Sequence, residues 1–266
     1  MKFSFKRDLH IHSYLSLCSG DLEQTNEKIL QYAEENELEE VCVTNHFWDE
    51  NVPGASDWYS SQNYEHVSKA KPLPQTDKVR FLFGCETDIN RHMTLGISKE
   101  RIELFDFIII PTTHFHMKGF TLSQDEASDC LSRANAWVKR LDAVLNMELP
   151  FHKIGLAHLT CNAIAPVREE YLRVLELLPE EEMKRLFKRV AQLGAGIELN
   201  YGDMSFADEE EDIVLRPYRI AKECGCKFYC GSDAHHPKTF DKAKETFERA
   251  IDKLGLTDED EFVLHK

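Results

Sequence analysis

Histidine and carboxylate side chains follow directly after short apolar runs in this sequence of 266 residues. In chain order they are His10-Ile11-His12, Asn45-His46, Glu86-Thr87-Asp88, His114-Phe115-His116, His158 and Asp233-Ala234-His235-His236. Imidazole nitrogens and carboxylate oxygens are ligands that suit zinc, iron or manganese. The cysteines are scattered without a repeated C-x-x-C pair, which argues against a closed structural zinc site. The sequence therefore predicts a metal site of the open, catalytic kind.

The spacing and number of these residues indicate more than one ion. His10 and His12 are two positions apart, so on an extended strand both point to the same side and can chelate one ion or bracket two. The two oxygens of Glu86 can bridge two ions, which an imidazole cannot do. A mononuclear catalytic site uses about three or four protein ligands. The larger set here predicts two or three divalent ions.

Elements that would position these residues alternate along the chain. We expect strands at residues 5–10, 40–44, 79–86, 105–111, 154–158, 196–200 and 227–232. Helical patterns occur at residues 26–36, 62–71, 124–146, 180–193, 213–223 and 240–254. This alternation predicts a parallel α/β sheet, either doubly wound or closed, and seven units favour a barrel. Because the C-terminal strand ends of a barrel meet on one face, six of the seven ends would bring ligands together. The sixth strand offers Glu198 and Asn200 instead of an imidazole.

The rest of the chain is expected to support this one site. No linker rich in Pro, Gly or Ser divides it, so residues 1–266 are predicted to form a single domain. Residues 48–78 are expected to form a long loop with a short helix that covers the site. The acidic run 208–212 is interpreted as a solvated helix start. Ordinary turn or core positions are expected for His66, His152 and His265.

Charge and hydropathy exclude several classes of partner. With 32 basic and 47 acidic residues, the formal net charge is −15, counting the 12 histidines as neutral. Stable nucleic-acid binding needs a cationic surface and is not expected. No apolar run approaches the roughly 18–20 residues that span a bilayer, so no membrane partner is expected. The N-terminus lacks a secretion signal, which predicts a cytoplasmic protein whose eight cysteines are mostly reduced.

The ordered motifs resemble those of the PHP (polymerase and histidinol phosphatase) family. They are Asp8-Leu9-His10-Ile11-His12-Ser13, Thr44-Asn45-His46, Gly84-Cys85-Glu86, Thr113-His114, Ala157-His158 and Gly231-Ser232-Asp233-Ala234-His235. The resemblance spans nearly the whole chain, and its opening and closing motifs are specific together. It implies a distorted, TIM-like barrel of seven β/α units with a trinuclear metal site at its C-terminal face.

The resemblance also implies a ligand set, which comprises His10, His12, His46, Glu86, His114, His158, Asp233 and His235. One ion would be held by His10, His12, Glu86 and Asp233. Glu86 would bridge it to a second ion held by His114 and His158, and His46 and His235 would hold a third. Asp8 and Asp88 are expected to support the ligands through hydrogen bonds.

Two departures from the family pattern concern the third ion. The family commonly has a further His or Asp in the loop after the first motif, where this sequence has Cys18 and Asp21 as tentative ligands. Asn45 stands where Asp is frequent, and its amide can still orient an imidazole. His114 is preferred to His116 as the ligand, because it aligns better with the motif.

Such a cluster suits phosphoester hydrolysis. It would supply hydroxide as the nucleophile near neutral pH and stabilise charge on the transferring phosphoryl group. We expect a phosphatase of the histidinol phosphatase type that converts a small phosphomonoester to inorganic phosphate. Beyond the metal ligands, no catalytic residue or leaving-group acid is assigned. The alternatives are a nucleotide-directed phosphatase or phosphodiesterase, hydrolysis of a carbon–nitrogen bond, and a PHP domain that binds metal without turnover.

Overall fold

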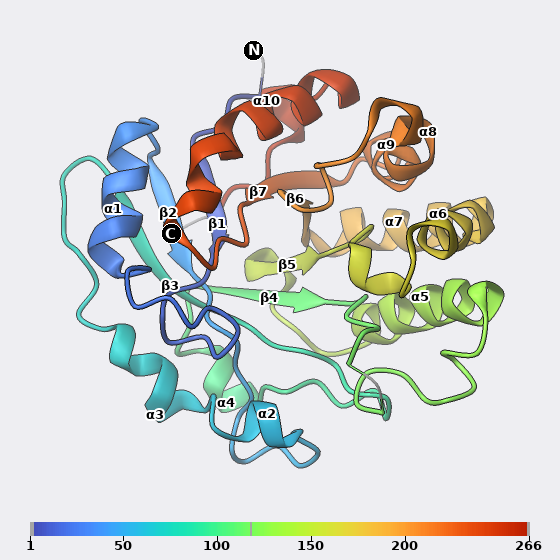
Figure 1. Cartoon of the computed structure of the whole chain (residues 1–266), viewed down its shortest axis with the longest axis horizontal. Helices are drawn as coiled ribbons and strands as arrows, with labels where there is room; N and C mark the ends of the chain where they lie inside the picture. The colour runs from blue at the N-terminus through green and yellow to red at the C-terminus, as the bar shows by residue number, and fades with distance from the viewer. Residues whose placement is uncertain (1–2, 118, 265–266) are drawn as a thin grey trace.

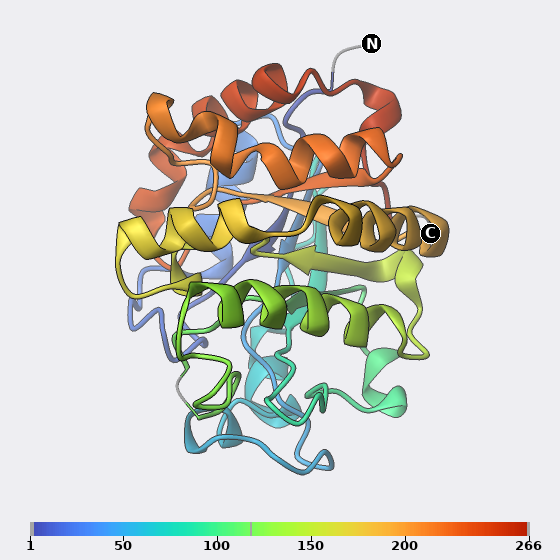
Figure 2. The same ribbon diagram turned by 90° about the vertical axis from the view of Figure 1, so that its right-hand side faces the viewer.

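A closed barrel of seven parallel strands forms the centre of the computed structural model, which describes residues 3–117 and 119–264 (Figures 1 and 2). The strands are β1 (Arg7–Ile11), β2 (Glu40–Val43), β3 (Arg80–Glu86), β4 (Phe107–Pro111), β5 (Ile154–Ala157), β6 (Gly196–Asn200) and β7 (Lys227–Gly231). Each strand pairs with the next in the sequence, and β7 returns to β1 through the pair Asp8 and Cys230. The seven-stranded α/β barrel predicted from the sequence is confirmed.

Apolar side chains cover both faces of the strands, as expected for a parallel sheet with an outer layer of helices. The β4 segment Phe107–Pro111 is buried at every position. Phe107 of β4 lies against Tyr229 of β7 with ring centroids 5.2 Å apart. These strands are not neighbours, so the contact crosses the barrel interior. Phe262, near the end of the described chain, packs on both rings and closes the end where β4 and β7 begin. The opposite end is left for polar side chains.

The helices form the outer layer. Their bounds are α1 (Asn26–Glu35), α2 (Asp57–Ser60), α3 (Tyr64–Val67), α4 (Lys99–Ile102), α5 (Cys130–Leu145), α6 (Arg168–Leu177), α7 (Glu180–Leu193), α8 (Glu211–Val214), α9 (Arg216–Glu223) and α10 (Ala243–Leu254). Short 3-10 helices lie at Ser68–Ala70, Phe151–Lys153, Asn162–Ile164, Asp208–Glu210, Pro237–Lys242 and Asp258–Asp260.

Several helix predictions differ from the structure at identifiable residues. The helix predicted from residue 124 begins at Cys130, because the side chain of Asp129 caps it by accepting from the Ser132 amide. The helix predicted for 213–223 is two helices, and Pro217 stands in the first turn of the second. Helix α6 was not predicted, although Tyr171, Val174 and Leu175 form a buried stripe at helical spacing.

Helix α7 has the predicted ends. Glu180, Glu181 and Glu182 occupy its first turn, where the helix dipole favours negative charge. It ends at Gly194, whose φ of 79° lies in the left-handed region that glycine adopts without a steric penalty.

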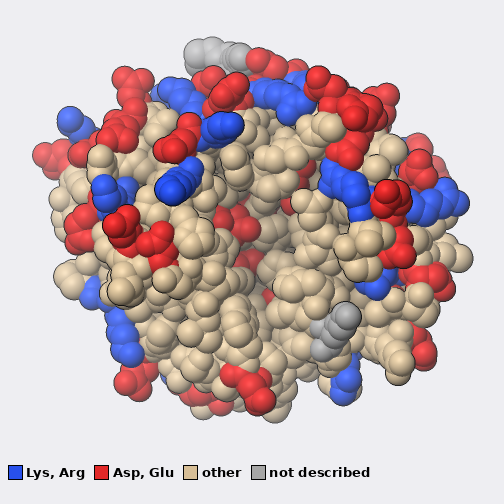
Figure 3. Space-filling model, viewed as in Figure 1, with Lys and Arg blue, Asp and Glu red and all other residues tan. Residues whose placement is uncertain are grey.

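Two further features concern the distribution of charged side chains on the surface and the state of the cysteines. On the face shown in Figure 3, side chains of both signs are interspersed and do not form a continuous basic patch. All eight cysteines are free thiols, and five of them are buried. Within the described residues, no helix has the combined length and apolar character that crossing a bilayer requires.

Candidate metal centre

The predicted ligands converge at the C-terminal mouth of the barrel. His10 and Glu86 belong to β1 and β3, and the remaining ligands follow the ends of β1, β2, β4, β5 and β7. Four overlapping groups have potential ligand atoms within 4.8 Å of one another. The groups are His10/His12/Glu86/Asp233, Glu86/His114/His158, His12/Cys18/His46/His235 and His10/His158/Glu198. All eight residues of the predicted ligand set lie in these groups.

Glu86 lies at the centre of the cluster. Its side chain is 1% exposed, and neither carboxylate oxygen has a hydrogen-bond partner. Oε2 lies 3.0 Å from Nδ1 of His46 and 3.2 Å from Nε2 of His12. Oε1 lies 3.5 Å from Nε2 of His158 and 3.8 Å from Nε2 of His114. A buried carboxylate left without hydrogen bonds among imidazoles fits a bridge between cations.

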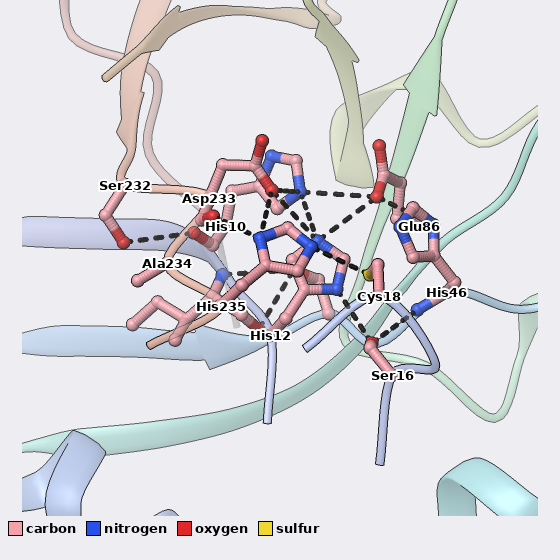
Figure 4. A network of polar contacts seen from close by, with 12 residues as sticks. His10, His12, Ser16, Cys18, His46, Glu86, Ser232, Asp233, Ala234 and His235 are labelled. Carbon is pink, nitrogen blue, oxygen red and sulfur yellow. Dashed lines mark hydrogen bonds and ion pairs between the residues drawn. The ribbon is translucent and has the colours of Figure 1, made fainter. Parts of the chain in front are cut away.

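His10 and His12 extend from β1 side by side, as their spacing predicted (Figure 4). Their Nε2 atoms are 3.0 Å apart. Asp233 Oδ1 lies 3.4 Å from Nε2 of His10 and 3.1 Å from Nε2 of His12. The two nitrogens and this oxygen therefore converge on one point, together with Oε2 of Glu86.

Several of the clustered imidazoles form a hydrogen bond through Nδ1, on the side of the ring that faces away from the cluster. This bond directs Nε2 towards the cluster. His10 Nδ1 lies 2.6 Å from Glu198 Oε1, and His114 Nδ1 lies 2.9 Å from Asp88 Oδ2. Because an ionised carboxylate only accepts, each Nδ1 carries a proton, and in the neutral ring Nε2 presents a lone pair. Such outer hydrogen bonds fix the tautomer and orientation of metal-binding histidines.

A serine and an asparagine do the same for His12. The Ser16 hydroxyl donates to Asn45 Oδ1 over 2.9 Å and lies 2.8 Å from Nδ1 of His12. Since its proton is used, the hydroxyl accepts from His12. Asn45 thus orients the imidazole indirectly. It also accepts from the amide of Ser13, which ties β2 to the loop after β1.

Burial and the neighbouring charges shift the pKa values in the cluster. Burial alone would raise the pKa of Glu86, but the nearby His46 and His10 hold it well below its usual range. Burial also opposes a charged His10, yet Glu198 and Asp233 hold the pKa of that imidazole well above its ordinary value. For His235, burial prevails and lowers the pKa to about 3. The cluster without ions therefore keeps protons on some imidazoles, which bound cations would displace.

Two of the predicted ligands have strained backbone conformations. His158 and Asp233 have φ values of 61° and 51°, in the left-handed region that non-glycine residues rarely adopt. Such conformations cost about 1–3 kcal/mol each and concentrate at functional sites. His158 comes directly after β5, and Asp233 is two residues beyond the end of β7. These left-handed conformations turn the chain at the mouth of the barrel.

The supporting and tentative residues divide into two kinds. Asp88 contacts the imidazole of His114, whereas Asp8 accepts from Tyr32 Oη and from the backbone amides of Ser232 and His10. Cys18 lies in the cluster. Asp21 lies outside it, with Oδ2 3.0 Å from Nδ1 of His236.

The remaining histidines lie outside the four groups. The His116 ring lies 5.5 Å from that of His114. His66 Nε2 lies 2.6 Å from the Leu15 carbonyl oxygen, and His152 is exposed. His265 lies outside the described residues.

A cavity of about 580 Å³ opens over the cluster. Its apolar wall includes Trp58, Tyr59, Met117 and Phe120. The two residues from α2 belong to the segment 48–78, which was predicted to cover the site. Tyr59 Oη donates to Asp88 over 2.6 Å, and Asp88 in turn contacts His114, so this wall is linked to a predicted metal ligand. The volume is within the usual range of small-molecule sites, about 300–1,000 Å³.

Sequence reasoning missed the roles of Glu198 and Ser16. Glu198 lies within β6, the strand that ends without an imidazole, so a carboxylate two residues before a strand end was the available signal. Its carboxylate lies 2.6 Å from Nδ1 of His10, whereas Nε2 of that ring faces Glu86 and Asp233. Glu198 therefore acts as a hydrogen-bond acceptor for His10. No sequence pattern pointed to Ser16.

Comparisons with known proteins identify the family and the fold of this chain. A family model described as the PHP domain matches residues 8–255. Histidinol phosphate phosphatase (HisK) from Lactococcus lactis, solved in complex with zinc, L-histidinol and phosphate, is 19% identical with a TM-score of 0.61. That alignment covers 96% of this chain and 95% of the other. A putative histidinol phosphatase (HisK) from Listeria monocytogenes is 14% identical with a TM-score of 0.61, over 91% of this chain and 100% of the other. Among the curated proteins, no match was found. At these identities the two structures establish the shared fold.

Proposed function

Because this chain belongs to the PHP domain family, we propose that it is a metal-dependent phosphatase of small phosphomonoesters. The observation that carries the proposal is the position of Glu86. Its two buried oxygens have no hydrogen-bond partner and lie among imidazoles contributed by β1 and by the segments after β2, β4 and β5. This donor set fits two or three divalent ions of zinc, iron or manganese.

The ions would be divided among three sets of residues. We assign one to His10, His12, Asp233 and Glu86, a second to Glu86, His114 and His158, and a third to His46 and His235. When bound, these ions would lower the pKa of a coordinated water and neutralise charge on the phosphoryl oxygens. The chain's own task is to orient the imidazoles, which Glu198, Ser16 and Asp88 do through hydrogen bonds to the Nδ1 atoms.

The apolar wall defines how an ester would lie in the cavity. The phosphate would face the ligands, and the organic group would contact Trp58, Tyr59 and Phe120. These rings offer flat surfaces against which a planar group can pack. We propose histidinol phosphate as the first substrate to test, since the Lactococcus protein of the same fold was solved with L-histidinol and phosphate.

The test measures inorganic phosphate released from histidinol phosphate, an aryl phosphate, nucleoside monophosphates and other metabolite phosphates. The protein is loaded separately with zinc, manganese or ferrous iron. We expect hydrolysis of at least one monoester and its loss in Glu86→Gln. The matched control is Glu181→Gln, because the Glu181 side chain is 89% exposed on α7. Failure of the metal-loaded protein to hydrolyse any monoester, or full activity of Glu86→Gln, would contradict the proposal. Hydrolysis of only a diester or an amide would contradict it as well.

A further inference from the structure

Cys18 lies beside imidazoles at the mouth of the barrel, in the loop that follows β1. Its Sγ is 2.8 Å from Nε2 of His235. His12, His46 and His235 each offer a nitrogen within 4.8 Å of this sulfur and of one another. Figure 4 shows the sulfur turned towards these rings. The four residues together provide one sulfur and three nitrogens, which is a donor set typical of zinc.

The loop that carries Cys18 is fixed on both sides of the cysteine. The Leu17 amide donates to Gln62 Oε1 over 3.1 Å, and the Ser19 hydroxyl donates to the His235 carbonyl over 2.6 Å. Ser16 is held by Asn45. The chain therefore places Cys18 against the segment after β7 by contacts that do not involve the thiol.

His235 is prepared to bind through the nitrogen that faces the sulfur. Its Nδ1 lies 2.7 Å from the carbonyl oxygen of Asp233. A carbonyl oxygen only accepts, so Nδ1 carries the proton and Nε2 presents its lone pair towards Cys18. We refer to Cys18, His46 and His235 as the corner. Nδ1 of His46 lies 3.0 Å from an oxygen of Glu86 that has no hydrogen-bond partner, so this buried carboxylate joins the corner to the rest of the cluster.

We propose that Cys18, His46 and His235 hold one ion through a sulfur and two nitrogens, and that this corner selects zinc or another thiophilic ion over manganese and magnesium. The inference concerns the third ion of the function proposed above and rests on it for the phosphatase role. Binding replaces the S–H bond of Cys18 by a metal–sulfur bond and releases one proton. Thiolate is a soft ligand that favours zinc, whereas manganese and magnesium favour oxygen. His12 belongs to both this group and the neighbouring one, and we assign it to the first ion.

The test is absorption spectroscopy of the cobalt-substituted protein, because cobalt(II) bound to thiolate absorbs in the near ultraviolet by sulfur-to-metal charge transfer. We expect this band in the wild type and in Cys130→Ser, and its loss in Cys18→Ser. Cys130 is a matched control, since it is partly exposed at the start of α5. The zinc-to-manganese affinity ratio should fall at least about 10-fold in Cys18→Ser, given that even outer hydrogen-bond partners contribute about 10–100-fold. Cys18→Asp, which supplies an oxygen ligand, should shift the preference towards manganese.

The outcomes separate this inference from the proposed phosphatase function. Phosphate release by a wild-type protein that lacks the charge-transfer band would overturn the sulfur ligand and leave the phosphatase standing. A band in the wild type without phosphate release would support the sulfur ligand and contradict the phosphatase. An unchanged band in Cys18→Ser would assign the absorption to another thiol and overturn the inference.

Discussion

Replacing Glu198 by Gln tests whether hydrogen bonds outside the ligand layer hold the metal-binding geometry. Glu198 is fully buried, and its carboxylate contacts both His10 and His158, the residue that follows β5. Oε1 accepts from His10 Nδ1 over 2.6 Å, and Oε2 accepts from the His158 amide and from Asn200 Nδ2, each over 3.2 Å. The two oxygens therefore face three donors.

Glutamine has nearly the same shape but only one acceptor oxygen. If its oxygen faces His10, its amino group meets the donors from His158 and Asn200. In the opposite orientation the amino group meets His10 Nδ1, and the proton on that ring moves to Nε2. The lone pair that faces Glu86 and Asp233 is then lost. A buried unsatisfied donor costs about 1–3 kcal/mol.

The expected result is a metal affinity about 10–100-fold weaker than that of the wild type, the range observed for outer-shell partners. Competition with a chromophoric chelator measures the affinity, and circular dichroism verifies the fold. Glu181→Gln is again the exposed control. Wild-type affinity in Glu198→Gln would refute the orienting role. Complete loss of one ion at saturating metal would also refute it, by identifying Glu198 as a direct ligand.

Three further predictions concern protons, substrate and the barrel core. Burial opposes a charged His10, but Glu198 and other carboxylates outweigh it and raise the pKa of this imidazole well above 6.5, so without metal it is protonated near neutral pH. Metal binding should therefore release protons, and the metal affinity should rise with pH. Titration calorimetry in buffers of different ionisation enthalpy measures the number of protons released. The prediction fails if proton release is zero. Trp58→Ala should raise KM for an aryl phosphate more than it lowers kcat, because Trp58 lines the cavity and is not a ligand; steady-state kinetics with an equal loss in kcat would contradict this. Phe262→Ala should lower the free energy of unfolding of the metal-free protein in urea by about 3–5 kcal/mol and leave metal stoichiometry unchanged, since Phe262 packs at the opposite end of the barrel; an unchanged unfolding midpoint would contradict it.

The barrel and its ligand positions could be predicted because parallel strands have a direction. Once residues near 5–10, 79–86 and 227–232 are assigned as strands, closure brings His10, Glu86 and Asp233 to one end. Short apolar or β-branched runs were sufficient to predict that all seven strands exist. The start of α5 and the division between α8 and α9 depended on single residues, Asp129 and Pro217, which periodicity does not weigh.

The surroundings of the ligands depend on contacts that no periodic pattern records. Ser16 acts through a loop conformation fixed by Asn45, which is 29 positions away in the sequence. The same loop brings Cys18 to His235 and leaves Asp21 beside His236 at the surface. Only the tertiary arrangement distinguishes these two tentative ligands.

The number of ions bound per chain tests the central claim most directly. Native mass spectrometry of the protein saturated with zinc and exchanged into volatile buffer should show two or three ions per chain. Glu86→Gln should hold fewer ions than Glu181→Gln, because it replaces the carboxylate shared by two of the ligand groups. A wild-type protein with at most one ion, or a Glu86→Gln variant with the full number, would contradict a multinuclear centre bridged by Glu86.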